Sequence, residues 1–331
     1  MTTTATAQKQ SPAKKPIRKV AVLMGGWSSE REVSLVTGGA VCKALEEMGY
    51  EYRAIDVQRD TAGLLQALTM QSDGRPDVVF NALHGRVGED GTVQGLLEFI
   101  GIPYTHSGVL ASSIAMDKPL MKVVAKIAGV PSPEGRVVSR QEILDHGYPF
   151  PPPFVIKPTN EGSSVGVRVV MDDEDIKNIE EDGWIYGNKV LVEQFIPGKE
   201  LTVAVLGETD GARALGVTEL RPINHLFYDY TAKYSGGETE HLLPAPLPKN
   251  VYDEAMRLAV LAFEAVGCCG AARADFRWDD TKDGVSGLYF LELNTQPGMT
   301  PTSLLPEQAA FAGIPFNDLI RWMLEHPTCP A

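Results

Sequence analysis

Two stretches late in the chain indicate both its fold and its candidate site: GAARADFRW (residues 270–278) and GLYFLELN (residues 287–294). Each alternates apolar with polar side chains, which predicts two β-strands with one buried and one polar face. Residues two apart on a strand point to the same face. The polar faces therefore carry paired groups: Arg273 with Asp275, and Glu292 with Asn294.

If the two strands are neighbours, these groups share one polar face. That face combines two carboxylates, an amide oxygen and a guanidinium. Mg²⁺ is bound by oxygen ligands of this kind, typically one or two carboxylates together with substrate phosphates. The alternative is a solvated strand face with an ordinary ion pair. The opposite face is expected to be buried, and its side chains are Phe276, Leu291 and Leu293.

The beginning of the chain reads as strand, turn and helix. Residues 18–24 form an apolar run that two glycines end. The spacing Ser29-x-x-Glu32 predicts a capping box at the start of the helix, and Gly49 is expected to end it. Two further strands follow in YEYRAIDV and DVVFNAL. This rhythm predicts an α/β unit with a parallel sheet and helices on its faces.

Two loops at the carboxyl ends of these strands carry candidate site residues, because open α/β sheets bind ligands at that edge. Glu30 follows the first strand and could neutralise a substrate ammonium, or it could simply interact with the helix N-terminus. His84 begins the segment HGRVGEDG after a later strand. A lone histidine is more often structural, and the surrounding glycines favour a binding loop.

A lysine and a glycine-rich loop form a further candidate site. Lys157 ends the strand FVIKP, and small residues follow in NEGSSVG (residues 160–166). Backbone N–H groups of such a loop can fold over phosphates, and a plain hairpin turn is the alternative. The sequence contains neither GxxxxGK[ST] nor GxGxxG, so a Walker loop and a Rossmann dinucleotide site have no motif support.

The middle of the chain contains two breaks. A helical pattern at 108–116 meets Asp117-Lys118-Pro119, which predicts an N-cap and a first-turn proline. Residues 222–249 have no convincing period and contain YDYTAKY. So long a loop is usually functional, and aromatic residues with a lysine can close a site and exclude water. A surface loop with packed tyrosines is the alternative. Helix is expected again at 250–266.

Composition limits the possible partners and compartment. The chain has 331 residues and a formal charge of −13, which argues against nucleic acid or an anionic membrane as partner. No apolar run approaches the ~20 residues of a membrane helix. Residues 1–17 are polar and basic and contain no apolar core segment, so we expect a disordered tail and not a secretory signal. The cysteines lack CxxC spacing and fit a reducing cytoplasm, with Cys268 and Cys269 expected as small core residues; the others are Cys42 and Cys329.

Together these segments resemble the D-alanine–D-alanine ligase family of the ATP-grasp superfamily. The resemblance covers residues 18 to about 325. The matching motifs, in the family's order, are GGWSSEREVSL, ALHGRVGEDGTVQG, IPYTHSG, MDK, VIKPTNEGSSVG, EQFIPGKELTV, YDYTAKY, ARADF and LELNTQPGMTPTSLLP. The run Pro151–Pro153 departs from the commoner family pattern and touches none of the matched site residues.

The resemblance implies an ATP-grasp fold, α/β overall and α+β in its ATP-binding part, with an N-terminal Rossmann-like domain built on a parallel sheet. The expected divisions are a tail at 1–17, a substrate domain at 18–116, a central ATP-grasp subdomain at 117–205, and a C-terminal one at 206–331. The last would carry the metal site and a lid loop at 222–249.

The resemblance also implies roles for individual residues. Those that would contact ATP are Lys118, Lys157, Glu161, Gly162, Ser164, Val165, Glu193, Phe195, Ile196, Glu200 and Lys233. Two Mg²⁺ ions, for which Mn²⁺ is expected to substitute, would be held by Asp275, Glu292 and Asn294. Glu30 would bind the first D-alanine in a trio with Ser163 and Tyr234, with His84 beside it. Arg273 and the N–H of Gly298 would stabilise an oxyanion, and Ser303 and Leu304 would line the second substrate's site.

The implied activity is that of an ATP-dependent carboxylate–amine ligase. It would join two D-alanines through a D-alanyl phosphate for peptidoglycan synthesis, as a cytoplasmic homodimer. The alternatives are a ligase making D-alanyl-D-lactate or D-alanyl-D-serine, another ATP-grasp carboxylate–amine ligase, or a non-catalytic nucleotide-binding protein that kept the fold.

Overall fold

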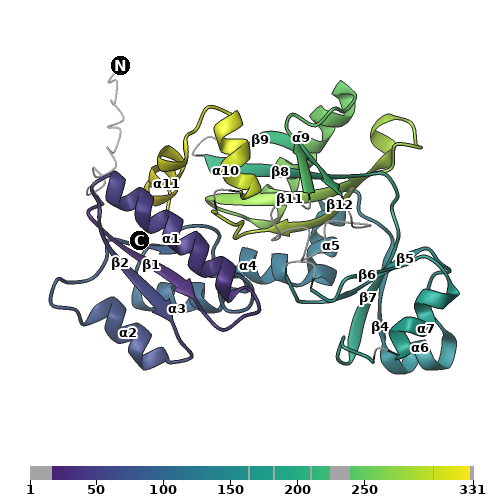
Figure 1. Cartoon of the computed structure of the whole chain (residues 1–331), viewed down its shortest axis with the longest axis horizontal. Helices are drawn as coiled ribbons and strands as arrows, with labels where there is room; N and C mark the ends of the chain where they lie inside the picture. The colour runs from purple at the N-terminus through teal and green to yellow at the C-terminus, as the bar shows by residue number, and fades with distance from the viewer. Residues whose placement is uncertain are drawn as a thin grey trace, which may run out of the picture.

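The elements of the chain form three sheets covered by helices (Figure 1). The computed structural model describes residues 17–162, 165–181, 183–208, 211–223, 239–300 and 302–328. The α/β fold class is confirmed: one sheet is parallel and the other two are antiparallel. The division at 116/117 and 205/206 stays a prediction, and strand β8 (Lys199–Glu208) runs through residue 205.

The N-terminal sheet has the order β2-β1-β3 and is parallel throughout. Its strands are β1 (Lys19–Gly25), β2 (Glu51–Val57) and β3 (Val78–Asn81). The covering helices are α1 (Arg31–Glu47), α2 (Thr61–Thr69) and α3 (Thr92–Ile100). Alternate residues of β1 enter two different cores, because both faces of a parallel sheet are covered.

The start of α1 differs from the expected capping box. The N-cap residue is Glu30, and it makes no side-chain cap hydrogen bond. The Ser28 hydroxyl instead accepts from the Glu30 N–H at 3.2 Å and donates to the His84 carbonyl at 2.7 Å. A long-range contact between two loops therefore replaces the local cap that the spacing of Ser29 and Glu32 predicted. The end of the helix near Gly49 is confirmed.

The expected break near Asp117 is confirmed. Helix α4 (Val109–Met116) ends there, and α5 (Lys118–Ile127) begins with Asp117 as N-cap. The Asp117 carboxylate accepts from the Leu120 N–H at 3.0 Å, and Pro119 lies in the first turn. This arrangement places Lys118 at the first helical position.

A four-stranded antiparallel sheet follows, with the order β4-β7-β5-β6. Its strands are β4 (Gly135–Ser139), β5 (Phe154–Pro158), β6 (Arg168–Val170) and β7 (Lys189–Gln194). Helices α6 (Arg140–His146) and α7 (Asp173–Glu181) accompany it. Phe154, Ile156 and Val192 are fully buried in its small core.

The five-stranded antiparallel sheet has the order β10-β9-β8-β11-β12. Besides β8, its strands are β9 (Gly211–Pro222), β10 (Thr239–Leu242), β11 (Ala271–Trp278) and β12 (Leu288–Asn294), the last preceded by a 3₁₀ turn at Gly284–Gly287. Its helices are α9 (Lys249–Val266), α10 (Leu304–Phe311) and α11 (Phe316–Glu325). The short strand β10 lies inside the segment 222–249, for which no strand was expected.

Helices cover both faces of this sheet, as alternation along β8 requires. Val203 and Val205 enter the core that contains α5 and α9. Ala204 and Leu206 enter the core that contains α10, α11 and residues of β1 and β3. The second core therefore joins the five-stranded sheet to the N-terminal unit and fixes their edges against each other.

Of the two cysteines expected in the core, Cys268 is buried and Cys269 is not. Cys42 and Cys268 are buried free thiols, and burial raises their pKa values to about 11 and about 12. Cys269 is exposed, because it lies in the turn between α9 and β11 and its side chain points away from the core that Cys268 enters. Cys329 lies outside the described residues.

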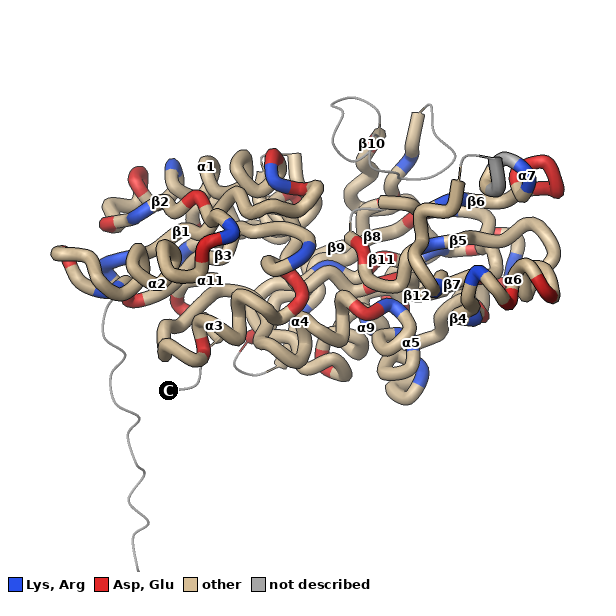
Figure 2. Tube along the Cα trace, turned by 90° about the horizontal axis from the view of Figure 1, so that it is seen from below, with Lys and Arg blue, Asp and Glu red and all other residues tan. Residues whose placement is uncertain are grey.

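The surface charge is mixed. Basic and acidic residues are interspersed along the described chain, and they gather into no continuous basic stripe there (Figure 2). Among the described helices, not one has the length and apolar character that crossing a membrane requires.

Candidate active site

Strands β11 and β12 are antiparallel neighbours, and their register aligns the four polar residues. Arg273 is opposite Asn294, and Asp275 is opposite Glu292. Directly opposed residues have Cβ atoms about 4.5–5.5 Å apart. The register shifts immediately after Asp275, so that Phe276 pairs with Phe290.

That shift is a β-bulge, and it corrects one expectation. The extra residue is Leu291, which is only half-buried and lines a cavity beside Glu292. It was expected on the buried face with Phe276 and Leu293, which are indeed buried. A bulge puts two residues opposite one and turns the following side chains, so alternation along the sequence fails at this point.

The charged groups of this face are already paired within the protein. Arg273 donates to both Asp275 oxygens, from Nε at 2.8 Å and from Nη2 at 2.7 Å. The Thr202 hydroxyl donates to Asp275 at 2.6 Å. Lys118 Nζ lies 3.2 Å from Glu292 and donates to the Glu161 carbonyl at 2.7 Å. The alternative interpretation of this face was a solvated strand with an ordinary ion pair. The ion pair is present, but its groups face a cavity.

Two cavities meet at this face. The larger has a volume of about 1280 Å³ and the smaller about 110 Å³. They share Lys118, Glu161 and Glu292 as lining residues. Arg273 and Asn294 line the larger cavity, whereas Asp275 lines the smaller. The polar strand face therefore lies at the junction between the two.

A buried carboxylate bridged by two lysines forms one wall of the smaller cavity. Glu193 is 2% exposed and pairs with both Lys122 and Lys157. Burial alone would raise the pKa of Glu193, but the charges and hydrogen bonds of the two lysines outweigh it and hold that pKa below its usual range. Burial lowers the pKa of Lys122. Lys122 was not expected in the site, although it lies four residues after Lys118 on the same helix face.

The rest of the smaller cavity is largely apolar with one charged end. Its aliphatic lining comes from Val155, Val165, Val167, Val169, Ile196 and Leu291. At the charged end Arg277 lies 5.8 Å from the ring centroid of Phe195, 3.4 Å from Glu200, and donates to the Ile196 carbonyl at 3.1 Å. An apolar cavity with polar groups at both ends suits a heteroaromatic ligand that carries phosphates.

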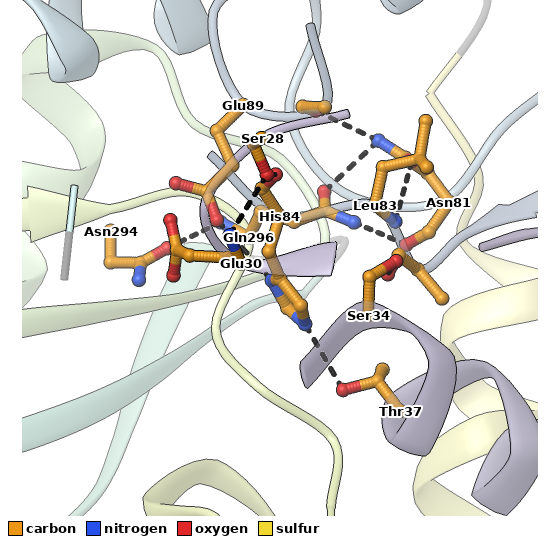
Figure 3. A network of polar contacts seen from close by, with 12 residues as sticks. Ser28, Glu30, Ser34, Thr37, Asn81, Leu83, His84, Glu89, Asn294 and Gln296 are labelled. Carbon is orange, nitrogen blue, oxygen red and sulfur yellow. Dashed lines mark hydrogen bonds and ion pairs between the residues drawn. The ribbon is translucent and has the colours of Figure 1, made fainter. Parts of the chain in front are cut away.

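Glu30, His84 and Glu89 also line the larger cavity, and they lie together in a polar network with Asn294 nearby (Figure 3). Glu30 is 5% exposed at the N-terminus of α1. The His84 ring lies 3.0 Å from the Thr37 hydroxyl through Nε2 and 3.3 Å from Glu89 through Nδ1. Both ring nitrogens thus have partners, and the ring orientation is fixed.

Glycines let the loops approach Glu30. A Cβ added to Gly85, which has φ +68°, would lie 2.8 Å from Glu30 Oε2, and one on Gly162 would lie 3.1 Å from the same atom. Steric crowding against Glu30 therefore explains why glycine occupies these two positions, one in HGRVGEDG and one in NEGSSVG. They bring two backbone segments to one buried carboxylate.

An amide network joins the N-terminal sheet to the end of β12 (Figure 3). Gln296 donates to the Asn81 carbonyl, and the Asn81 amide lies 3.3 Å from Gln296 Oε1. The Gln296 N–H donates to Asn294 Oδ1 at 2.8 Å. Asn81 and Gln296 were not expected in the site, because amides that act on backbone groups leave no pattern along the sequence.

The loop after β12 completes the larger cavity with Gly298, Ser303 and Leu304. The Ser303 hydroxyl accepts from the Thr300 N–H at 3.0 Å. A Cβ on Gly298 would lie 2.8 Å from that hydroxyl, so the loop is tightest at this glycine.

Every described residue that the sequence analysis assigned to the site lines one of the two cavities. The smaller one is lined by Lys157, Val165, Glu193, Phe195, Ile196, Glu200 and Asp275, and the larger by Glu30, His84, Gly162, Arg273, Asn294, Gly298, Ser303 and Leu304, with Lys118, Glu161 and Glu292 in both. Ser163, Ser164, Lys233 and Tyr234 lie outside the described residues, as does most of the expected lid loop.

The donor set for a metal is two carboxylates and an amide. Among the described residues no group of three or more Asp, Glu, His or Cys side chains is arranged to hold a metal ion. Oxygen donors in this small number fit Mg²⁺, which completes its octahedron with water and substrate phosphates. The expected metal site therefore depends on a nucleotide that supplies further oxygens.

Comparison with known proteins gives one consistent result. Residues 58–107 match the family model described as D-ala D-ala ligase N-terminus, and residues 132–325 match that of the D-ala D-ala ligase C-terminus. The chain is 52% identical over 315 residues to a D-alanine–D-alanine ligase of Chelativorans sp., covering 95% of this chain and 99% of that protein. It is 51% identical over 314 residues to that of Rhizobium meliloti, covering 94% and 98%.

Solved structures agree with the sequence matches. The D-alanine–D-alanine ligase of Bacillus anthracis complexed with ATP superposes with a TM-score of 0.75 at 30% identity, covering 93% of this chain and 97% of that one. The VanG D-Ala:D-Ser ligase of Enterococcus faecalis superposes with a TM-score of 0.75 at 28% identity, covering 94% and 99%.

Proposed function

The chain belongs to the D-alanine–D-alanine ligase family, and we propose on this premise that it joins two D-alanines at the expense of ATP. The products are D-alanyl-D-alanine, ADP and phosphate, and the dipeptide serves peptidoglycan precursor synthesis. The observation that carries the proposal is the register of β11 and β12, which aligns Arg273, Asp275, Glu292 and Asn294 at the junction of the two cavities.

ATP binds in the smaller cavity in this proposal. Its apolar part receives the adenine beside Phe195 and Ile196, where Glu193 accepts from the amino group, and Glu200 accepts from the ribose. Lys118 and Lys157 face the phosphates, with the loop at 161–165 over them. The ATP-bound structure from Bacillus anthracis supports this nucleotide for a chain of the same fold.

Asp275, Glu292 and Asn294 would hold two Mg²⁺ ions. The ions neutralise charge on the terminal phosphates when they are bound. Arg273 and Lys118 now pair with two of these carboxylates. Once metal takes the carboxylates, Lys118 would turn toward a phosphate and Arg273 toward the carboxylate of the first D-alanine. The exchange keeps each carboxylate paired.

The first D-alanine lies in the larger cavity with its ammonium at Glu30. Glu30 is a buried carboxylate that lines this cavity, and opposite charges attract more strongly in such a site than in water. The ammonium lies beside His84. Ser163 and Tyr234 are proposed to complete this contact. The D-alanine carboxylate then attacks the γ-phosphorus of ATP in line. The bond from that phosphorus to the β–γ bridging oxygen breaks, and ADP leaves with Lys118, Lys157 and Lys233 around its charge.

The second D-alanine binds against Ser303 and Leu304. Its neutral amine attacks the acyl carbon, and the resulting oxyanion accepts from Arg273 and from the Gly298 N–H. The carbon–oxygen bond to phosphate then breaks, phosphate leaves, and the nitrogen gives its extra proton to water. Two steps replace one because oxide is a poor leaving group and phosphate is a good one.

A phosphate-release assay with purified protein tests the proposal. With ATP and Mg²⁺, we expect release that depends on D-alanine and is absent with L-alanine. Supplying D-serine or D-lactate beside D-alanine separates the alternative ligases, and the higher identity to D-alanine–D-alanine ligases than to the D-Ala:D-Ser ligase favours the dipeptide. ATP binding without D-alanine-dependent release would instead indicate a non-catalytic protein.

The assembly and compartment are also proposals. The family resemblance suggests a cytoplasmic homodimer, and the reduced thiols Cys42 and Cys268 agree with a reducing compartment. Sedimentation equilibrium measures the assembly: a mass near twice the 35.9 kDa of the chain is expected. A mass of one chain across the micromolar range would contradict it.

A further inference from the structure

A histidine–glutamate pair lines the larger cavity, and the proposed mechanism uses neither residue. His241 belongs to β10 and Glu307 to the first turn of α10. His241 Nδ1 lies 3.0 Å from Glu307 Oε2, and the side chains are 20% and 35% exposed. Both residues line the larger cavity.

Glu307 lies one turn along from the residue that the second D-alanine contacts in the proposal. Ser303 is the N-cap of α10, and the Glu307 N–H donates to the Ser303 carbonyl at 3.2 Å. A displacement of the first turn of α10 would therefore move Ser303 and Leu304 with it.

The rest of α10 is attached elsewhere. Gln308 is fully buried and accepts from the Ala204 N–H at 2.7 Å, while its amide donates to the Thr202 carbonyl at 3.1 Å and to the Thr218 hydroxyl at 3.0 Å. These bonds fasten the helix to β8 and β9. On the exposed side of the first turn of α10, the contact is with β10, through Glu307 and His241.

Strand β10 is itself held in register. His241 pairs with Leu220 of β9, and Leu220 packs on Leu304 as a separate pair of buried apolar side chains. One apolar contact and the hydrogen bond between His241 and Glu307 therefore connect the β9–β10 hairpin to the start of α10. The apolar contact keeps the hairpin and the helix together. The hydrogen bond is directional, so it fixes how the first turn of α10 is rotated relative to β10.

We propose that His241 is a positioning residue that, through Glu307, sets the wall against which the second D-alanine binds. The proposal rests on the function proposed above. Because neither residue is among those that line the smaller cavity, loss of the pair leaves the phosphorylation of the first D-alanine intact and weakens capture of the second.

The experiment compares His241→Ala, Glu307→Ala and the double variant with the wild type. Initial rates over a wide range of D-alanine concentrations give separate KM values for the two substrate sites. We expect the KM for the second D-alanine to rise about fivefold in each single variant, the factor that a typical intramolecular hydrogen bond provides. The KM for ATP and kcat at saturation should stay within about twofold.

Non-additivity identifies the pair as one unit. The double variant should raise the second KM no further than either single variant, and His241→Gln, which can still donate to Glu307, should restore most of the loss. Arg321→Ala is the matched control, because it removes an exposed ion pair from the neighbouring helix α11 and should change none of these constants.

Two results would overturn the proposal. An effect of His241→Ala that Glu307→Ala does not share would mean that the histidine contacts substrate directly. Equal losses in all constants, together with a lowered melting temperature, would mean a purely structural role. If the wild type released no phosphate with D-alanine, the function itself would fail. Amide hydrogen exchange at 304–308 would still report the contact, since the pair predicts faster exchange in both single variants.

Discussion

Replacement of Arg273 by alanine should separate catalysis from nucleotide binding. Arg273 lines the larger cavity and now donates two hydrogen bonds to Asp275, at 2.8 and 2.7 Å. In the proposed function metal takes Asp275, and the guanidinium turns toward the reacting carboxylate. A donor aimed at a developing oxyanion contributes about 3–4 kcal/mol in other enzymes. We therefore expect kcat to fall about 10²–10³-fold in Arg273→Ala.

Affinity for ATP should change much less, by under about threefold, because Arg273 is not among the residues that line the smaller cavity. The chain offers a matched control four residues along the same strand. Arg277 lines the smaller cavity beside Glu200 and Phe195. Arg277→Ala should show the opposite division, with a raised KM for ATP and a kcat close to that of the wild type.

The assay measures ADP formation at varied ATP with saturating D-alanine, and calorimetry measures ATP binding directly. Thermal unfolding of both variants identifies the temperature range in which each is fully folded. A kcat for Arg273→Ala near the wild-type value would refute its role at the oxyanion. Equal loss of ATP affinity in the two arginine variants would refute the assignment of the cavities.

Three further outcomes are expected. Glu30→Gln keeps the shape of the side chain but removes its charge, so the KM for the first D-alanine should rise at least about tenfold in initial-rate measurements; an unchanged KM would contradict the ammonium contact. Burial lowers the pKa of His106 to about 3, whereas an unfolded histidine takes its proton near pH 6.5. The unfolded state therefore binds more protons below pH 6.5, and the free energy of unfolding should fall between pH 6.5 and 3. Asparagine tolerates the left-handed backbone that His106 adopts, with φ +71°, so His106→Asn is the test variant. Urea unfolding at pH 7 and at pH 5 gives the free energy of unfolding at each pH, and its decrease from pH 7 to pH 5 should be smaller by about 2 kcal/mol in the variant than in the wild type. Equal decreases in the two proteins would refute this. Glu193→Gln leaves Lys122 and Lys157 buried without a carboxylate, and chemical denaturation should give a free energy of unfolding lower by about 3 kcal/mol, whereas a change under about 1 kcal/mol would mean that water already screens the lysines.

The polar face of β11 and β12 could be predicted because strand alternation is a local property of the chain. Arg273 and Asp275 share a face for geometric reasons that need no knowledge of the neighbouring strand. The bulge that turns Leu291 toward the smaller cavity could not be predicted in this way. A bulge is defined by the pairing of two strands, and its position follows from packing on both of them.

Long-range contacts explain the other differences. A helix cap was expected from Ser29. Instead, the Ser28 hydroxyl accepts from the Glu30 N–H at the start of α1 and donates to the His84 carbonyl. Strand β10 was missed because four residues within a proline-rich segment carry too little pattern, and β9 supplies the edge on which it forms. Gln296 acts on backbone and amide groups of a strand more than 200 positions away, which no local signal records.

The most direct test is a crystal structure of this chain with a non-hydrolysable ATP analogue, Mn²⁺ and D-alanine. Anomalous scattering from manganese should place metal at about 2.1 Å from oxygens of Asp275, Glu292 and Asn294 and of the nucleotide's terminal phosphates. Arg273 should have turned from Asp275 toward the substrate carboxylate. Metal bound elsewhere, or a nucleotide whose phosphates lie far from these strands while Arg273 keeps both bonds to Asp275, would contradict the account.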